Sequence, residues 1–280
     1  MNRIDKQFAE LREKGEKALV GFVLAGDPSF DRSLELLAAM CDAGLDVLEL
    51  GVPFSDPTAD GPVIQRGGLR ALKSGSSLAG AIRMIGALRK KTDVPVVLFS
   101  YYNPIFAYGL EAFFRDAPAA GADGMLVVDL PPEEAAEMNE YLPDGNDFAL
   151  IRLVAPTTPP ERMHAIVKNA SGFIYLISKA GVTGGGGLDP EGIRKQAATL
   201  RAASGLPLCV GFGVSTPDDA AMLAPFVDGV VIGSTFENII EEYRDSPDLA
   251  ERLAGQVRSF KAAMRETAAM NSHKTGRMGG

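Results

Sequence analysis

Two carboxylates in the segment LELGVPFSDPTADGP are the first candidates for chemistry. Glu49 lies between Leu48 and Leu50, in an apolar run that is typical of a buried strand. Because an unpaired buried carboxylate costs free energy, Glu49 must either form a structural ion pair or belong to a reaction centre where burial raises its pKa. Asp60 follows in a loop rich in Pro, Asp and Gly, before a Gly-Pro pair that would open a helix. Two carboxylates in different surroundings commonly divide the acid and base roles of one reaction.

Three glycine-rich segments carry further candidates. Ile177–Gly187 contains four consecutive glycines, and it predicts either a plain flexible loop or a lid that closes over a substrate. Gly211–Pro217 and Ile232–Phe236 hold glycines that let a phosphate approach the backbone. In the last of these segments, Ser234 and Thr235 would start a short helix whose N–H groups and dipole favour an anion. We therefore expect a phosphate site at these two segments.

The remaining candidates are an aromatic residue and two thiols. Phe22, in the run FVLAGDPSF, is either a core residue or part of the wall of a ligand pocket, and both interpretations stay open here. Neither Cys41 nor Cys209 lies in a short cysteine or histidine spacing, so we expect no metal cluster. Two carboxylates, a lid and a phosphate site together suit proton-transfer chemistry at a carbon atom of a phosphate ester, without naming the substrate.

Eight short apolar runs alternate with helical patterns along the chain, and such runs are typical of a parallel sheet covered by helices on its faces. The expected strands are Ala18–Ala25, Leu45–Gly51, Pro95–Tyr101, Asp123–Asp129, Phe148–Val154, Gly172–Ser178, Pro207–Phe212 and Asp228–Gly233. The expected helices between them are Asp31–Ala43, Ser77–Lys91, Leu110–Ala117, Pro132–Tyr141, Pro159–Asn169, Pro190–Ala203, Thr216–Ala224 and Thr235–Tyr243. Eight βα units in 280 residues predict an α/β protein with a closed (β/α)8 barrel of the TIM type. Active sites of such barrels lie at the C-terminal ends of the strands, which is where the candidate residues fall.

The chain contains no linker-like segment, so we expect residues 1–268 to form a single barrel domain. The amphipathic segment MNRIDKQFAELREKGEK predicts an extra helix before the first strand, and a further helix is expected at Pro247–Met270. Residues 269–280, which end in the polar stretch NSHKTGRMGG, are expected to form a disordered tail.

Composition excludes several classes of function. The formal net charge is −8, so the chain has no basic footprint for nucleic acid. No apolar run is long enough to span a membrane, and the charged N-terminal segment does not resemble a secretion signal. We therefore expect a cytoplasmic protein that binds neither nucleic acid nor membrane. Such an acidic protein must attract an anionic substrate locally, through backbone N–H groups or a few cations.

Several segments together resemble the tryptophan synthase alpha chain family. LELGVPFSDPTADGP is similar to the family signature, and FVLAGDP, SYYNPIFAYG, VVDLPPEE, LVAPTTPPER, YLISKAGVTG and GFGVSTP follow in family order, from about residue 20 to residue 236. The chain departs from the family at three places. Thr58 stands where a larger apolar residue is usual, Lys179 where arginine is frequent, and Gly185–Gly187 where residues vary more.

The resemblance implies a lyase that splits indole-3-glycerol phosphate into indole and D-glyceraldehyde 3-phosphate by a retro-aldol step. Glu49 matches the general acid/base of the family, and Asp60 matches the carboxylate that hydrogen-bonds the indole N–H. Tyr175 and Thr183 match residues that hold Asp60 and the closed lid. Phe22 matches a pocket aromatic, and the phosphate-binding positions correspond to Gly184, Gly211, Phe212, Gly213, Gly233 and Ser234.

The resemblance also implies a partner. The family works as an α2β2 complex in which the beta subunit carries pyridoxal phosphate, so we expect no cofactor on this chain. Three rim segments, Pro53–Pro57, Asn103–Tyr108 and Pro131-Pro132, are expected as apolar and proline-rich loops that contact the beta subunit.

Other functions stay open at this point. One is a stand-alone lyase that releases free indole, and another is a non-catalytic barrel that only activates a beta subunit. A third is a related phosphate-binding barrel, such as indole-glycerol-phosphate synthase or phosphoribosylanthranilate isomerase. That third alternative would lack the spacing between Glu49 and Asp60.

Overall fold

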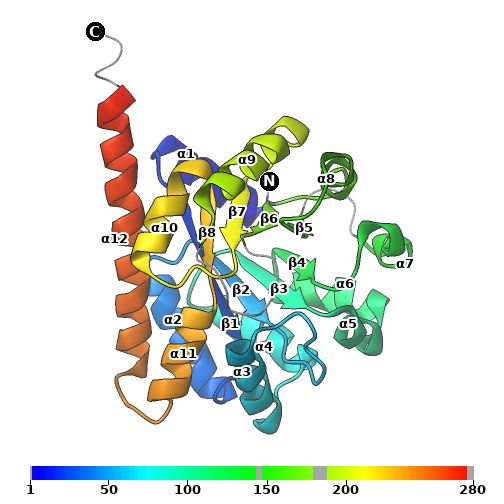
Figure 1. Cartoon of the computed structure of the whole chain (residues 1–280). Helices are drawn as coiled ribbons and strands as arrows, with labels where there is room; N and C mark the ends of the chain where they lie inside the picture. The colour runs from blue at the N-terminus through cyan, green and yellow to red at the C-terminus, as the bar shows by residue number, and fades with distance from the viewer. Residues whose placement is uncertain (1, 143–146, 179–187, 276–280) are drawn as a thin grey trace.

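Eight parallel strands form a closed barrel in the order β1 to β8 (Figure 1). The structure, a computed structural model, describes residues 2–142, 147–178 and 188–275, without the side chains beyond residue 266. The strands are β1 (Ala18–Leu24), β2 (Val47–Gly51), β3 (Val96–Ser100), β4 (Gly124–Val127), β5 (Ala149–Val154), β6 (Ile174–Ile177), β7 (Leu208–Gly211) and β8 (Gly229–Ile232). Each lies within a run expected from the sequence, so the predicted fold class is confirmed.

Alternate residues of each strand point into the barrel, because side chains change face at every residue. The register sets Phe22 of β1 beside Glu49 of β2, and Glu49 beside Val97 of β3. Phe22 and Val97 belong to a buried cluster that fills the barrel, whereas a second and larger cluster lies between strands and helices. Glu49 is therefore a polar residue in the row that faces the apolar interior.

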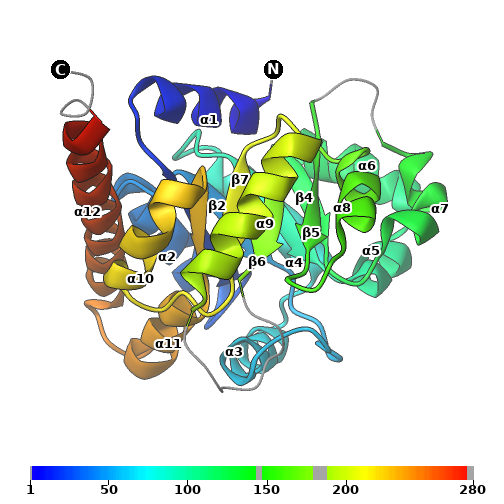
Figure 2. The ribbon, with the colours of Figure 1, turned by 45° about the horizontal axis from the view of Figure 1, so that its top comes forward.

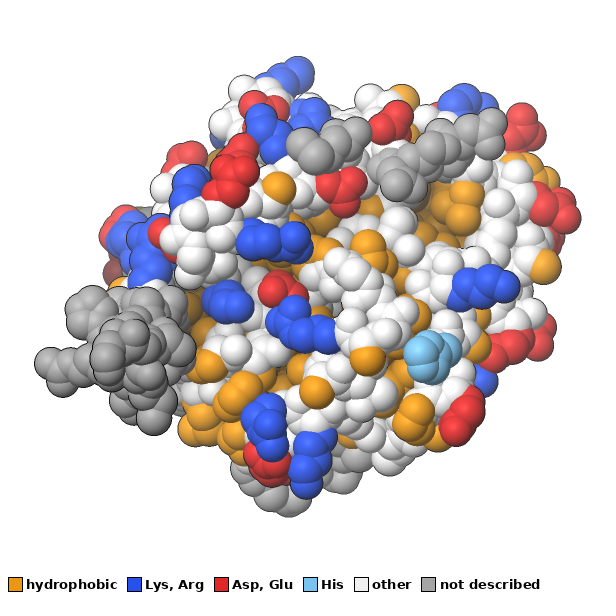
Figure 3. Space-filling view, turned by 90° about the horizontal axis from the view of Figure 1, so that it is seen from above, with side chains coloured by type: hydrophobic (Ala, Val, Ile, Leu, Met, Phe, Trp, Pro, Cys, Tyr) orange, Lys and Arg blue, Asp and Glu red, His pale blue; other side chains and the backbone are white. Residues whose placement is uncertain are grey.

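The extra helix expected before β1 is present as α1 (Arg3–Glu13), and it packs against the cluster that fills the barrel. It buries Ile4, Phe8 and Leu11, and the ring of Phe8 lies 5.8 Å from that of Phe173. Figure 2 shows α1 at one end of the molecule and α3 (Pro62–Lys73) at the other. Seen from above the view of Figure 1, acidic and basic side chains are interspersed, without a broad field of either sign (Figure 3).

The remaining helices surround the strands (Figures 1 and 2). They are α2 (Phe30–Asp42), α4 (Leu78–Leu88), α5 (Tyr102–Tyr108), α6 (Leu110–Ala120), α7 (Ala136–Asn139), α8 (Pro160–Val167), α9 (Pro190–Ala203), α10 (Pro217–Leu223), α11 (Ser234–Tyr243) and α12 (Leu249–Thr275). Two short 3₁₀ helices, Pro132–Glu134 and Ala224–Phe226, complete the described elements. None of the helices in the described part of the chain is long and apolar enough to cross a membrane.

Three elements differ from the sequence-based expectation. We expected a loop at Asn103–Tyr108, but these residues belong to α5, because Pro104 lies in the first turn, where a missing N–H costs nothing. The helix expected over Pro132–Tyr141 is divided into a 3₁₀ turn and the short α7. Helix α12 is continuous across residue 268 and is described as far as Thr275, whereas residues 276–280 lie outside the described residues.

Candidate active site

A cavity of about 940 Å³ lies at the C-terminal ends of the strands. Its wall combines both candidate carboxylates with aromatic side chains and with the loops that follow β7 and β8. The lining residues that matter most here are Phe22, Glu49, Asp60, Phe99, Tyr175, Phe212, Gly213, Gly233 and Ser234. The sequence-predicted residues in this group therefore share one cavity.

Glu49 has no exposed surface, and neither carboxyl oxygen has a hydrogen-bond partner among the described residues. Burial raises the pKa of Glu49 from 4.5 to about 8. The alternative of a structural ion pair finds no support, since no cation in the described part of the chain pairs with Glu49. A carboxyl group with this pKa keeps its proton near neutral pH, so it can donate that proton to a bound molecule.

Aromatic rings form the apolar surroundings of Glu49. Phe22, its register neighbour, packs edge-on against Phe99 with ring centroids 5.1 Å apart. The next inward position of β2 is Gly51, where a Cβ atom would lie 2.6 Å from Cζ of Phe22. Phe22 is 8% exposed, and it both packs in the barrel core and lines the cavity. The core interpretation is therefore confirmed, and contact of Phe22 with a ligand stays a prediction.

Asp60 lies in the loop between β2 and α3 and is half-buried. Burial raises the pKa of Asp60 from 3.8 to about 6, and a hydrogen bond from the Tyr101 hydroxyl opposes that rise. The same hydroxyl accepts a hydrogen bond of 2.9 Å from the backbone N–H of Ala59. Tyr101 therefore holds the loop at the residue before Asp60 as well as at Asp60 itself.

Tyr101 was missed by the sequence reasoning, which gave the task of holding Asp60 to Tyr175 and Thr183. The available signal was its place directly after a buried strand, within the segment SYYNP. Phe54 of the same loop packs against the ring of Tyr101 with centroids 5.2 Å apart. A buried tyrosine commonly finds a partner for its hydroxyl group, and here the hydroxyl contacts the loop that carries the carboxylate.

Tyr175 stands inside the barrel between Glu49 and the end of β7. It is 4% exposed, and burial, with a smaller effect of Glu49, raises its pKa well above 10. Its hydroxyl group lies over Gly211, where a Cβ atom would be only 2.1 Å from the hydroxyl oxygen. Gly211 is not among the residues that line the cavity; it leaves room for Tyr175, whose ring also packs against Phe212.

The backbone after β7 turns sharply at the cavity wall. Phe212 has φ 69° and Gly213 has φ 78°, so two successive residues adopt the left-handed region. For phenylalanine this conformation costs about 1–3 kcal/mol, and strain of this kind is found mostly at functional sites. Successive backbone N–H groups in such a turn form a concave surface that suits an anion.

Two helices begin beside this turn, and only one of them leaves its N-terminus open. Helix α10 is closed by a capping box in which Thr216 and Asp219 satisfy the first N–H groups. Helix α11 starts after Gly233 with no capping side chain among the described residues. Its leading N–H groups and dipole therefore remain available for an anion in the cavity. Thr235 donates a hydrogen bond of 3.0 Å to the carbonyl of Ser215 and so ties the two loops together.

Part of the predicted site lies outside the described residues. Thr183, Gly184 and the whole of the expected lid fall within residues 179–187. In the described part of the chain, no group of His, Cys, Asp and Glu side chains has the arrangement of a metal site. Burial raises the pKa of Cys41 to about 12 and that of Cys209 well above 9, so neither thiol is a reactive nucleophile.

Comparison with known proteins identifies the family. A family model described as tryptophan synthase alpha chain matches residues 8–266. Alpha chains from Desulfosudis oleivorans and Desulfatibacillum aliphaticivorans are 59% and 55% identical to this chain, over 94% and 95% of its length and 99% and 100% of theirs. The solved alpha subunit of Legionella pneumophila (strain Paris) superposes with a TM-score of 0.86 at 39% identity, covering 95% of this chain and 99% of that one. A chain of Mycobacterium tuberculosis tryptophan synthase does so with a TM-score of 0.86 at 32% identity, covering 94% and 98%. The barrel described here therefore belongs to the tryptophan synthase alpha chain family.

Proposed function

We propose that this chain cleaves indole-3-glycerol phosphate to indole and D-glyceraldehyde 3-phosphate, which is the alpha reaction of tryptophan biosynthesis. Membership of the alpha chain family supports this proposal. The observation that carries it is the pairing of a proton-bearing Glu49 with an ionisable Asp60 on one cavity. These are the acid and the carboxylate that the reaction requires.

In the proposed mechanism, Glu49 protonates the ring carbon that bears the glycerol side chain. The ring nitrogen then carries positive charge, and the carboxylate of Asp60 accepts a hydrogen bond from the indole N–H and stabilises that charge. Loss of a proton from the adjacent hydroxyl forms the aldehyde and breaks the carbon–carbon bond. The electrons of that bond return to the ring, and neutral indole leaves. The hydroxyl proton passes to a base at the cavity or to solvent, which balances the proton that Glu49 delivers.

The substrate would lie with its indole ring near Phe22 and its phosphate at the turn after β7. Supporting this orientation, Gly213 and Ser234 line the cavity, Gly213 lies in the turn with positive φ, and α11 begins at Ser234 without a capping side chain among the described residues. From the family resemblance, Thr183 and Gly184 would complete the binding site. Gly211 would contribute by leaving space for Tyr175.

We further propose that the chain works with a tryptophan synthase beta subunit as an α2β2 complex in the cytoplasm. Pyridoxal phosphate would be carried by the beta subunit, with no cofactor on this chain. An exposed aromatic on the rim supports a contact surface, because Phe106 of α5 is 56% exposed. Pro53–Pro57 and Pro131-Pro132 belong to the same proposed surface.

Indole release from indole-3-glycerol phosphate by the purified chain tests the proposed reaction. A related phosphate-binding barrel or a non-catalytic activating subunit would release none. Adding a cognate beta subunit then separates the remaining alternatives. An activated rate and co-elution indicate the complex, whereas an unchanged rate and separate elution indicate a stand-alone lyase.

A further inference from the structure

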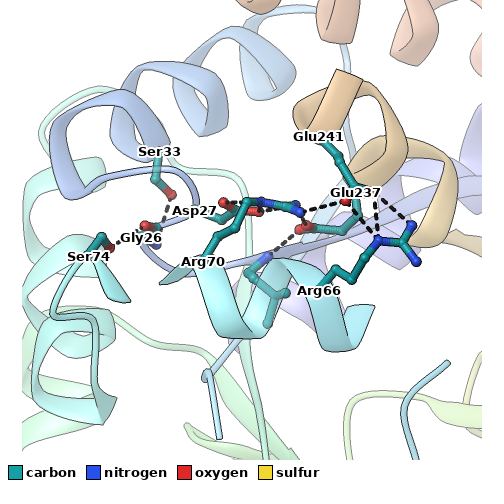
Figure 4. Close-up of polar contacts among 9 residues, drawn as sticks. Gly26, Asp27, Ser33, Arg66, Arg70, Ser74, Glu237 and Glu241 are labelled. Atoms are coloured by element: carbon teal, nitrogen blue, oxygen red, sulfur yellow. Dashed lines mark hydrogen bonds and ion pairs between the residues drawn. The ribbon is translucent and has the colours of Figure 1, made fainter. Parts of the chain in front are cut away.

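A second carboxylate is fully buried close to the site but takes no part in the proposed chemistry. Glu237 lies one turn into α11 and has no exposed surface. Its Oε1 atom accepts a hydrogen bond of 2.8 Å from the backbone N–H of Leu24, at the end of β1 (Figure 4). An acidic residue is seldom buried without a partner, so its neighbours must explain its presence here.

The neighbours are an aspartate and an arginine from two other elements. Asp27, in the loop three residues after the end of β1, has no exposed surface and accepts hydrogen bonds of 3.0 Å and 2.7 Å from Nε and Nη2 of Arg70. Nη2 of Arg70 also lies 3.8 Å from Oε2 of Glu237. Figure 4 shows these side chains converging from the loop after β1, from α3 and from α11. Arg70 thus connects α3 to both of the other elements.

A proton on Glu237 balances the charges of this cluster. Glu241, one turn further along α11, pairs with Nη1 of Arg70 at 3.1 Å and with Arg66 at 2.8 Å. Three carboxyl groups therefore meet two guanidinium groups. Burial and the neighbouring carboxylate of Asp27 raise the pKa of Glu237 to about 8. Oε2 of Glu237 finds no hydrogen-bond donor among the described residues, so a proton on this oxygen is what lets it face the carboxylate of Asp27. As a neutral acid, Glu237 can donate to Asp27 while it accepts from Leu24.

The helices meet at this point without spare room. A Cβ atom added to Gly67 of α3 would lie 2.5 Å from Oε2 of Glu237 and 3.2 Å from a carboxylate oxygen of Asp27. Glycine at this position therefore lets α3 pack directly against the buried acid. The C-terminal end of α3 is also fixed, because the hydroxyl group of Ser74 donates a hydrogen bond of 2.9 Å to the carbonyl oxygen of Gly26.

Both helices begin at the cavity. Helix α3 opens at Pro62, directly after the loop that ends in Asp60, and α11 opens at Ser234, where the phosphate is proposed to bind. At about 1.5 Å of rise per residue, Glu237 lies only about 5 Å along α11 from Ser234. A shift of α3 against α11 would therefore change the separation between Asp60 and the phosphate site.

We propose that Glu237 and Arg70 are positioning residues that fix this separation by locking α3 to α11 through Asp27, an inference that rests on the proposed function. Without the lock, a substrate anchored by its phosphate would present its indole ring out of register with Asp60. Misplacement of a reacting group by about 1 Å costs about 10²-fold in rate. This misplacement lowers kcat. Phosphate affinity also falls, without being abolished, because Glu237 holds the first turn of α11, where the phosphate is proposed to bind.

Matched variants separate positioning from plain stability. Arg70→Met removes the lock, whereas Arg89→Met breaks a comparable buried ion pair with Asp123, which precedes β4 at the opposite end of the barrel. Both variants should lower the melting temperature. At a temperature where circular dichroism shows both to be folded, Arg70→Met should lower kcat for indole release ~10-fold or more. The affinity for inorganic phosphate, measured by titration calorimetry, should fall with it. Arg89→Met should leave kcat and phosphate affinity within about twofold of the wild-type values, because Arg89 lies far from the cavity.

Glu237 variants test the same lock without removing a charge pair. Glu237→Gln keeps an acceptor for Leu24 and a donor for Asp27, so it should retain kcat and phosphate affinity, whereas Glu237→Ala should lower both. Equal behaviour of Arg70→Met and Arg89→Met, or of the Gln and Ala variants, would overturn the proposal. If the wild-type chain releases no indole, the proposed function fails, and phosphate titration of the same variants still decides the role of the lock.

Discussion

Replacing Glu49 by glutamine keeps the size of the side chain but removes its ability to ionise. In the folded protein the pKa of Glu49 is about 8, against an ordinary value of 4.5. Below pH 4.5 the group is protonated in both the folded and the unfolded chain and has no effect on stability. As the pH rises towards 8, the unfolded chain loses this proton and the folded chain keeps it. The wild type therefore loses stability over this window, and the glutamine variant does not.

The structure sets the size of this effect, because Glu49 is fully buried and solvent does not screen it. Each tenfold difference in proton affinity between the two states is worth about 1.4 kcal/mol. The variant should therefore be more stable than the wild type by about 3 kcal/mol at pH 7, and by under about 1 kcal/mol at pH 5. Above pH 8 the difference levels off at about 5 kcal/mol. A residue kept at this cost indicates selection for chemistry over stability.

Urea unfolding of both proteins at pH 5, 7 and 8.5, followed by circular dichroism, measures the difference directly. The same change at an exposed position, Glu111→Gln on α6, is the control and should alter stability by under about 0.5 kcal/mol at each pH. A Glu49→Gln variant with the stability of the wild type at all three values would refute the assignment of a buried, proton-bearing acid.

Three further predictions follow from the same geometry. The pH profile of kcat/KM should be bell-shaped. The rate should rise near pH 6, as Asp60 ionises, and fall near pH 8, as Glu49 loses its proton. A flat profile over this range would contradict both roles. Tyr101→Phe removes the hydrogen bonds to Asp60 and Ala59, so kcat should fall ~10-fold. The acidic limb of the pH profile should move to higher pH, because the hydroxyl group no longer lowers the pKa of Asp60. An unchanged acidic limb would show that Tyr101 does not influence the pKa of Asp60. Gly213→Asp puts a carboxylate at the proposed phosphate site, so calorimetric titration should show much weaker binding of D-glyceraldehyde 3-phosphate, and unchanged affinity would place the phosphate elsewhere.

The barrel was predictable because its signal is local and repeated. Strands buried on both faces, such as Val96–Ser100, appear as continuous apolar runs, and eight of them alternate with helices. Glu49 stood out because it interrupts such a run. By contrast, α5 was missed because Asn-Pro favours a turn, although a proline in the first turn of a helix is harmless.

Contacts between distant segments could not be read from the sequence. The Tyr101 hydroxyl accepts a hydrogen bond from a loop that precedes it by some forty residues. In the sequence, a tyrosine directly after an apolar strand is indistinguishable from an ordinary core residue. The pairing of Arg70 with Glu237 joins α3 to α11 across most of the chain, and both residues lie in helices whose charged positions appear solvated in the sequence alone. Gly211 was expected to contact phosphate, and only the structure reveals the Tyr175 hydroxyl above it.

The central claim is that Glu49 delivers the proton that lets indole leave. Indole release from indole-3-glycerol phosphate by purified Glu49→Gln tests it most directly, with circular dichroism to verify the fold. The claim predicts a loss of roughly 10² to 10⁴ in kcat, the usual contribution of a general acid. A variant that is folded and retains most of the wild-type rate would contradict it.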